Sequence, residues 1–561
     1  MVLLLAAVGV IVVVNWISER TGLPSAALLT LVGIGYALLP GPNPSLNPDV
    51  VMTCILPPLL YNAALESSFV GIRRNLRTII SLSVVLVLVT ASLIGAAFGL
   101  LVSGATFAAG TALGASVAPT DPVAALAVAR KVGLPLNMIT LIEGEGLFND
   151  ATALTTLSMA IAVARGAGFS MPSAVGRFVL AALGGLVVGL MLAFCRRFLR
   201  RWTHDVLTAN AISLATPFLT YLAAEKVHAS GVLAVVVCGL IVGHDSPRSE
   251  SGANRLQTRA VWRLVNFLLE GLVFLLIGQQ LPSILDGLRG YELSTIIVAI
   301  TVTVAVVLLV RPLWLFLTQS LPRPLHTRLG NVCGTSSNDD AHTTAGLRQQ
   351  DRNSERLSGR EVFVLSWAGT RGVVSLAAIF TVPFVTDSGA PFPDRDLLLF
   401  CAFVVVLVTL IGQGSTFGPV VRALGLQANA VDEVRLRNQA RMAAVHAALD
   451  RLDELDQRHR DDVGTRAIDG VREQLSTRLE RYQHRLDLLE LSDSDEIPIS
   501  PEYEAAVGIR RAAIDAQRDE LVRWRDAGML PDRSLRVLQR ELDHEEGTLP
   551  TRTLRSQGHN L

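Results

Sequence analysis

The chain has 561 residues, of which 50% are hydrophobic and only 17% are charged, and its mean hydropathy is +0.44. A soluble protein of this length carries more charge, so the composition excludes ordinary soluble enzymes and indicates a polytopic membrane protein. The 49 basic and 49 acidic residues balance, so the net charge gives no reason to expect a nucleic-acid partner. The five cysteines are scattered without a CxxC pair, which argues against a zinc or disulfide framework.

Apolar runs separated by polar or Pro/Gly-rich stretches predict thirteen membrane-spanning helices, since about 20 apolar residues cross a bilayer. The first run lacks a basic leading segment and a small-residue cleavage site, so we expect a retained helix and not a signal peptide. The predicted spans cover residues 2–17, 24–39, 50–66, 77–103, 106–129, 137–164, 174–199, 206–225, 230–244, 258–281, 292–319, 361–386 and 396–424.

The loops between these spans alternate in charge. Arginines and lysines cluster at 73–77, 130–131 and 196–201, whereas the intervening loops hold only isolated basic residues. Because basic loops stay in the cytoplasm, we expect a multi-pass protein of the plasma membrane with its N-terminus outside and its C-terminus inside.

Thirteen spans divide into six, a linker helix and six. The fifth span of the first half contains Pro119 and Pro122, and the fifth span of the second half contains Gly369 and Gly372. Helix-interrupting residues at matching positions predict a transporter of two inverted repeats, with broken helices crossing near the membrane midplane. The alternative is a pair of ordinary kinked helices.

The predicted span at 137–164 contains three polar side chains. Glu145 and Asn149 are four residues apart and share one helix face, and Asp150 follows directly. An ionised carboxylate in hydrocarbon is costly, so these residues indicate an ion or proton site; a polar cluster that ties helices together is the alternative. Burial favours a neutral carboxylic acid, so a proton can compete with a cation for Asp150 near neutral pH. Two further intramembrane carboxylates, Glu225 and Glu270, are equally consistent with structural and proton-access roles.

Several spaced motifs resemble the signatures of the monovalent cation:proton antiporter family, in the electroneutral branch that includes bacterial sodium/proton antiporters and the animal exchangers. The resemblance covers residues 1–425. The main motifs are Thr-Asp-Pro-Val at 120–123, Glu-Gly-Leu-Phe-Asn-Asp at 145–150 and Trp-Ala-Gly-Thr-Arg-Gly at 367–372, with further matches at 56–60, 230–234 and 270–278.

This resemblance implies an all-α membrane protein that exchanges Na+ for H+ in pH and sodium homeostasis, without net charge movement; a K+/H+ antiporter is the alternative. It implies a homodimer with no cofactor besides the transported Na+ and H+, and no enzymatic activity. Two rivals from other classes are an intramembrane aspartyl protease, with Asp121 and Asp150 as its pair, and a cation channel. The protease would need a GxGD-type motif, which residues 144–146 do not match, and a channel has no need of a proton-titratable Asp.

The resemblance also assigns roles to individual residues. Asp150 would bind either the cation or the proton, and Thr120 would offer a hydroxyl oxygen to Na+. Asn149 would mark the electroneutral type, since electrogenic relatives carry a second Asp there. Asp121 and Arg371 would have supporting roles and would neutralise the half-helix dipoles at the crossing. Glu145 would also have a supporting role, as the partner of Arg311.

The sequence departs from the family pattern at two positions. Gly146 stands where the family usually has Ser, so one hydroxyl ligand is missing. Asn62 stands where an acidic residue is frequent, with Glu66 one turn later. Glu66 lies near the basic cluster at Arg73, so an interfacial salt bridge is as reasonable for it as an ion-binding role.

The remaining segments are polar. Residues 322–360 contain nothing that could form a core, so we predict a flexible loop. From about residue 428, apolar residues recur at intervals of three and four, which predicts three or four amphipathic helices. We therefore divide the chain into a transmembrane domain at 1–425 and a cytoplasmic helical tail at 426–561.

Overall fold

The computed structural model describes thirteen stretches of the chain, and within them it is built from helices, with one isolated β-bridge between Val385 and Pro391 and no strand. The predicted loop at 322–360 falls almost entirely outside the described residues. The described residues are 2–21, 23–39, 48–102, 105–166, 170–202, 205–249, 252–320, 357–387, 389–426, 430–456, 462–491, 501–527 and 529–547.

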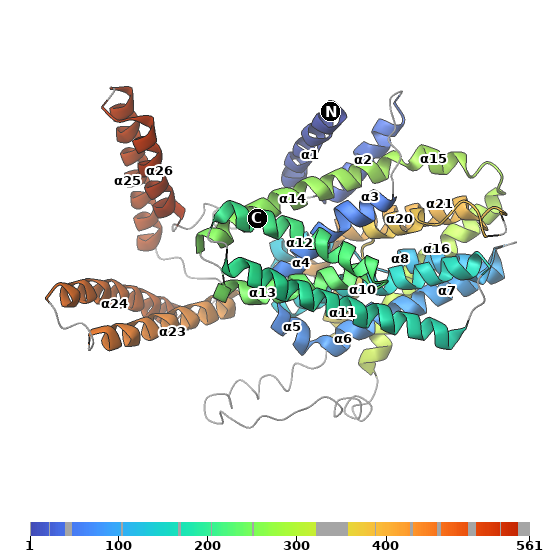
Figure 1. The fold of residues 1–561 in the computed structure, drawn as a ribbon, viewed down its shortest axis with the longest axis horizontal. Coiled ribbons are helices and arrows are strands. Elements are labelled where there is room, and N and C mark those ends of the chain that lie inside the picture. The colour runs from blue at the N-terminus through green and yellow to red at the C-terminus, as the bar shows by residue number, and fades with distance from the viewer. Residues whose placement is uncertain are drawn as a thin grey trace. The chain divides into compact units, whose positions relative to one another are not determined.

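The chain forms two compact units, Met1–Ala428 and Asn429–Leu561, which we describe separately. The helices of the first unit are shown in Figure 1 and include three π-helical segments. In chain order they are α1 (Val2–Thr21), α2 (Ser25–Ala37), α3 (Pro48–Val50), η1 (Val51–Ile55), α4 (Leu56–Glu66), α5 (Phe69–Arg74), α6 (Leu76–Ile80), η2 (Ser81–Val85), α7 (Leu86–Leu101), α8 (Phe107–Val117), α9 (Pro122–Val132), α10 (Leu136–Ala164), α11 (Met171–Arg201), α12 (Val206–Lys226), α13 (Gly231–Ser249), α14 (Gly252–Gln279), α15 (Leu281–Asp286), α16 (Leu293–Ser320), α19 (Gly359–Trp367), α20 (Val373–Phe380), α21 (Arg395–Leu407), η3 (Val408–Gln413) and α22 (Gly414–Ala423).

All thirteen predicted spans fall on these helices. Among the described residues, eight helical stretches are long and apolar enough to cross a membrane, and three shorter apolar helices accompany them. A helix satisfies every backbone hydrogen bond internally, which is why apolar runs in a membrane protein become helices. The number of crossings, the inverted repeat and the orientation of the termini stay predictions.

Two of the predicted spans are interrupted as their sequences suggest. The span at 106–129 divides into α8 and α9, and the span at 361–386 divides into α19 and α20. Pro122 is the first residue of α9, where a missing backbone N–H costs no helical hydrogen bond. Each break leaves backbone N–H and carbonyl groups without helical partners inside the bundle.

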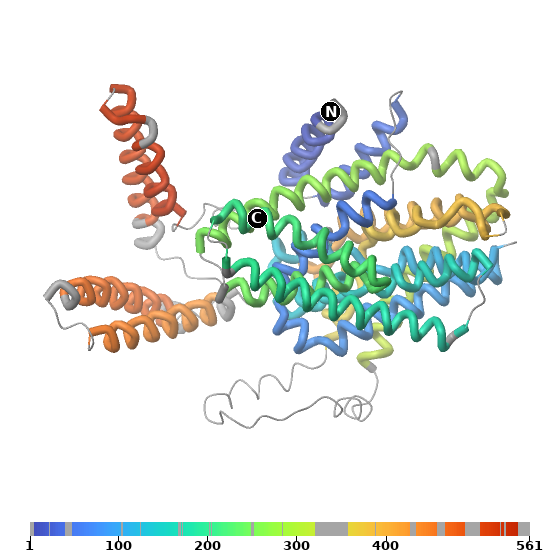
Figure 2. Tube along the Cα trace, viewed as in Figure 1, coloured from blue at the N-terminus to red at the C-terminus, as the bar shows by residue number. Residues whose placement is uncertain are grey.

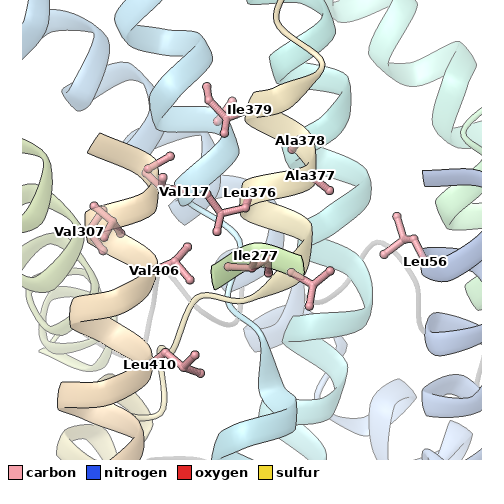
Figure 3. Close-up of a cluster of buried hydrophobic side chains, with 14 of the residues drawn as sticks. Leu56, Val117, Ile277, Val307, Leu376, Ala377, Ala378, Ile379, Val406 and Leu410 are labelled. Atoms are coloured by element: carbon pink, nitrogen blue, oxygen red, sulfur yellow. The ribbon is translucent and has the colours of Figure 1, made fainter. Parts of the chain in front are cut away.

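Buried apolar side chains surround these breaks. Figure 3 shows Val117 at the end of α8, Leu376 on α20 and Val406 on α21 as members of one buried cluster, which also includes Ile277 on α14 and Val307 on α16. In a bilayer such helices associate mainly through close packing. The unwound segments are thus enclosed by neighbouring helices and do not face lipid.

The second unit contains four helices in the described residues, α23 (Ala430–Asp456), α24 (Asp462–Leu491), α25 (Pro501–Asp526) and α26 (Asp532–Gly547), which form two antiparallel pairs (Figure 2). Ion pairs link the helices of each pair, with Arg472 2.8 Å from Asp453 and Arg518 2.6 Å from Glu546. A few apolar residues, such as Ile514, are buried between them. The cytoplasmic location of this unit stays a prediction.

Candidate ion-binding site

The two broken helices meet at their unwound segments. The backbone N–H of Asp121 donates to the carbonyl oxygen of Thr370 at 2.7 Å, and the Thr370 hydroxyl donates to the carbonyl oxygen of Asp121 at 2.7 Å. These bonds satisfy backbone groups that the breaks expose, and they fix the crossing point.

Asp121 caps the half-helices that begin on either side of this crossing. Its carboxylate accepts hydrogen bonds from the backbone N–H of Val123 in α9, at 3.0 Å, and from that of Val373 in α20. A negative charge at a helix N-terminus is stabilised by the helix dipole. The carboxylate lies so close to Gly372 that a Cβ there would overlap it. Asp121 is therefore held at the crossing by two helix starts.

Whereas Asp121 lies at the helix starts, Arg371 lies at the carbonyl ends of the broken helices. It is 3% exposed, and its Nε donates to the carbonyl oxygen of Val117 at 3.0 Å while its Nη1 donates to that of Gly369. Its backbone N–H donates to the Thr409 hydroxyl in η3 at 3.0 Å. Helix C-termini carry partial negative charge, so the guanidinium stabilises the carbonyl ends of the broken helices.

Glu145 and Arg311 form a buried ion pair between α10 and α16. Arg311 Nη2 donates to Glu145 Oε2 at 2.8 Å, and Arg311 Nη1 donates to Glu145 Oε1. The Leu365 carbonyl oxygen in α19 accepts from Arg311 Nε at 3.1 Å and from Nη2 at 2.9 Å. Both side chains are almost fully buried, so neither charge could remain here without the other.

Thr120 and Asn149 connect this pair to the crossing. The Thr120 hydroxyl donates to Glu145 Oε1 at 3.0 Å and accepts from Asn149 Nδ2 at 3.0 Å. Asn149 Nδ2 also contacts the Thr120 carbonyl oxygen at 3.2 Å. One lone pair of the Thr120 hydroxyl is left, and Asn149 Oδ1 is buried without a hydrogen-bond partner in the described part of the chain.

Asp150 differs from its charged neighbours. It is 5% exposed, and its carboxylate makes no hydrogen bond or ion pair with any residue that the structure describes. It lines a cavity of about 290 Å³ together with Thr120, Asp121 and Glu270. A buried carboxylate that faces a cavity without a protein partner can bind a small cation or a proton there.

The cavity extends to a charged cluster at the ends of α4 and α9. Arg130 Nη2 contacts Glu143 at 2.9 Å, Arg130 Nη1 contacts Glu66 at 3.6 Å, and all three residues line the cavity. The Arg130 side chain is 53% exposed, so the cavity leads from solvent-accessible residues to Asp150. The partner of Glu66 is thus Arg130 on α9, and not the cluster at Arg73 that lies nearer in sequence.

Gly146 lies against the ring of Pro122. A Cβ at Gly146 would be 2.6 Å from Pro122 Cγ and 2.7 Å from Cδ. This spacing leaves no room for a serine without moving α9 relative to α10. The departure from the family pattern is therefore linked to close packing at the break.

The other intramembrane carboxylates have different environments. Glu225 accepts a hydrogen bond from the backbone N–H of Gly231 and so caps α13. Glu270 lines the cavity, as does Asn266 one helical turn earlier on α14. Sequence analysis did not single out Asn266, although its four-residue spacing from Glu270 is the signal that could have identified it.

A bundle of membrane-length helices, with two broken helices crossing beside a buried carboxylate that has no partner among the described residues, is typical of a secondary transporter. The family model described as sodium/hydrogen exchanger, transmembrane, matches residues 4–423, and the chain belongs to this family. The protein is therefore a membrane antiporter and not an enzyme, which excludes the protease alternative.

Individual relatives agree with this assignment. An uncharacterised Na+/H+ exchanger of Mycobacterium tuberculosis is 33% identical over 97% of this chain and 95% of that protein. A sodium, potassium, lithium and rubidium/H+ antiporter of Bacillus pumilus is 32% identical over 68% of this chain and 56% of that protein. The structure of a sodium proton antiporter of Methanocaldococcus jannaschii superposes with a TM-score of 0.55 at 21% identity, covering 75% of this chain and 97% of that one, which shows a shared fold.

Proposed function

We propose that this protein exchanges one Na+ for one H+ across the plasma membrane, and that Asp150 is the group that binds each in turn. The observation that carries the proposal is the position of Asp150, which is buried at the broken-helix crossing, lines the cavity and has no partner among the described residues. The tail is cytoplasmic and the protein works as a homodimer in this proposal.

The charges at the crossing support an electroneutral cycle. Arg311 and Arg371 are two buried positive charges, and Glu145 and Asp121 are two negative charges bound to them or to helix N-termini. Asp150 adds a third negative charge. One monovalent cation or one proton makes this set neutral, and an uncompensated charge is costly in the membrane. The site therefore turns between the two sides of the membrane only when one or the other is bound.

The available ligands suit a hard cation. Asp150 supplies a carboxylate, Thr120 has one lone pair left, and the unwound segments expose backbone carbonyls. Such oxygen ligands, completed by water, bind Na+ in the manner known for other hard cations. The same ligands accept K+, and the Bacillus pumilus relative is named for four alkali cations, so K+/H+ exchange is the second candidate.

The proposal is tested in proteoliposomes with a pH-sensitive dye inside. Addition of Na+ outside should drive proton efflux in the wild type, and a parallel series with K+ and Li+ establishes the preference. Proton movement with K+ alone would favour the second candidate. Failure of every cation to move protons, in vesicles shown to contain folded protein, would overturn the proposal.

A further inference from the structure

The cavity beside Asp150 is strongly acidic. Its lining includes one basic residue, Arg130, among the residues that the structure describes. The five carboxylates of the lining are Glu66, Asp121, Glu143, Asp150 and Glu270. A cleft lined by one sign of charge concentrates counter-ions, so this cavity attracts cations.

Three of these five carboxylates already have partners. Glu66 and Glu143 contact Arg130, and Asp121 accepts backbone hydrogen bonds at the start of α9 and α20. Asp150 and Glu270 make no hydrogen bond or ion pair within the described ranges. Glu270 is thus the second carboxylate of the cavity that is available to a cation.

Two amide side chains line the same cavity as Glu270. Asn266, one turn earlier on the same face of α14, lines the cavity, and its Oδ1 is buried without a hydrogen-bond partner in the described part of the chain. Asn62 on α4 also lines the cavity, is 6% exposed, and its side chain has no hydrogen bond to a described residue. The helices α4 and α14 pack against each other. Buried polar groups without partners require an explanation, and a bound cation provides one.

We propose that Glu270, with the amide oxygens of Asn266 and Asn62, forms a second monovalent-cation site in this cavity, which loads the cation before it passes to Asp150. The proposal rests on the proposed function, because it concerns the same cation. The second site belongs to α4 and α14, whereas Asp150 belongs to α10. Cations in the two sites repel each other, so occupation of one favours release from the other.

Direct binding separates this site from Asp150. Radiolabelled Na+, with Rb+ in parallel, is added to purified protein and the bound cation is counted. We expect the Asp150→Asn variant to retain binding and the double variant Asp150→Asn with Glu270→Gln to lose it. No binding by Asp150→Asn, or equal binding by the single and double variants, would overturn the second site.

Transport provides a second readout. The Glu270→Gln variant should raise the apparent KM for Na+ by about fivefold or more, as loss of one nearby unit charge predicts. An unchanged KM contradicts the proposal. Glu292→Gln, which removes an exposed carboxylate that is not part of the cavity lining, is the matched control.

Two further variants cover a failure of Glu270→Gln to fold. Glu270→Asp keeps the charge and should stay closer to the wild-type KM, and Asn266→Asp adds a charge and should lower it. The opposite order of KM values would contradict the second site. Active exchange by Asp150→Asn would instead contradict the proposed role of Asp150. Failure of the second site and failure of the proposed function are therefore distinguishable.

Discussion

At the scale of single residues, the environment of each carboxylate separates its role from that of its neighbours. Glu145 and Asp150 lie on the same helix and both are buried, yet Glu145 is bound by Arg311 and Thr120 whereas Asp150 faces the cavity. A carboxylate with strong hydrogen-bond and ion-pair partners would have to lose these interactions in order to bind a cation. Asp150 has no such partner among the described residues, which suits it to repeated binding and release of a cation or proton.

The first prediction concerns Asp150→Asn. The variant should lose Na+-dependent proton movement in proteoliposomes, because an amide can neither carry the proton nor compensate the cation. It should melt in detergent at or above the wild-type temperature, since removing an unpaired buried charge is not destabilising. Asp286→Asn, at a 67% exposed side chain, is the control and should exchange normally. Robust exchange by Asp150→Asn would remove Asp150 from the proposed site.

The second prediction concerns Gly146→Ser, which introduces the residue usual in the family. The added Cβ meets the rigid ring of Pro122, so the variant should lose about 1–3 kcal/mol of stability, as overpacked sites do. Thermal unfolding in detergent measures the loss. Gly9→Ala is the matched control, because a Cβ at Gly9 has no neighbour within 4 Å. A serine variant as stable as the wild type would show that the α9–α10 contact adjusts freely.

At the scale of secondary-structure elements, buried charges hold the broken helices in place. Arg311 binds Glu145 on α10 and the Leu365 carbonyl on α19, so a single side chain of α16 fixes two other helices. Asp121 and Arg371 act on the free ends of the half-helices. The rigidity of the crossing thus comes from side chains of α10 and α16 and of the unwound segments.

The third prediction is a double-mutant cycle on Glu145 and Arg311. Glu145→Gln and Arg311→Met should each cost about 3–5 kcal/mol, because each leaves the other charge buried without its partner. The double variant should cost less than the sum of the two. Melting of the four proteins in detergent measures the coupling. Additive losses would mean that the two side chains do not interact in the membrane.

At the scale of the whole molecule, the number of titratable groups at the site sets the coupling between ion flux and membrane potential. Asn149 occupies the position beside Asp150, so an adjacent pair of aspartates is absent. One carboxylate that carries one cation in one direction and one proton in the other moves no net charge. The potential then performs no work on the cycle.

The fourth prediction is that the exchange does not respond to voltage. Proton flux is measured in proteoliposomes with a valinomycin-clamped potential of either sign, at fixed Na+ and H+ gradients. The reversal point should stay constant, since moving one net charge would contribute about 2.3 kcal/mol per 100 mV. A reversal point that shifts with potential would mean an electrogenic cycle, in which Glu270 is the first candidate for carrying a second proton.

Much of the fold could be predicted from the sequence, because a bilayer permits few structures. Apolar runs become helices wherever backbone groups must bond internally, and each of the thirteen predicted spans falls on helices. Pro122 likewise predicts the break before α9 from the local sequence alone. The charged residues within the span at 137–164 also indicated a candidate site, since such residues are costly without a function, and its role in ion binding stays a prediction.

The contacts at the site were decided by the tertiary structure alone. Glu145 and Arg311 are 166 residues apart in the chain, and residues alone could suggest their pairing only through a family resemblance. Helix packing places Pro122 against Gly146 and Arg130 beside Glu66. The same packing places Glu270 in the lining of the cavity. Local propensity and hydrophobicity act over a few residues, whereas these contacts depend on the crossing of segments distant in sequence. The sequence by itself determined where the helices and the isolated carboxylates lie, and the packing decided which carboxylates have partners and which remain available to a cation.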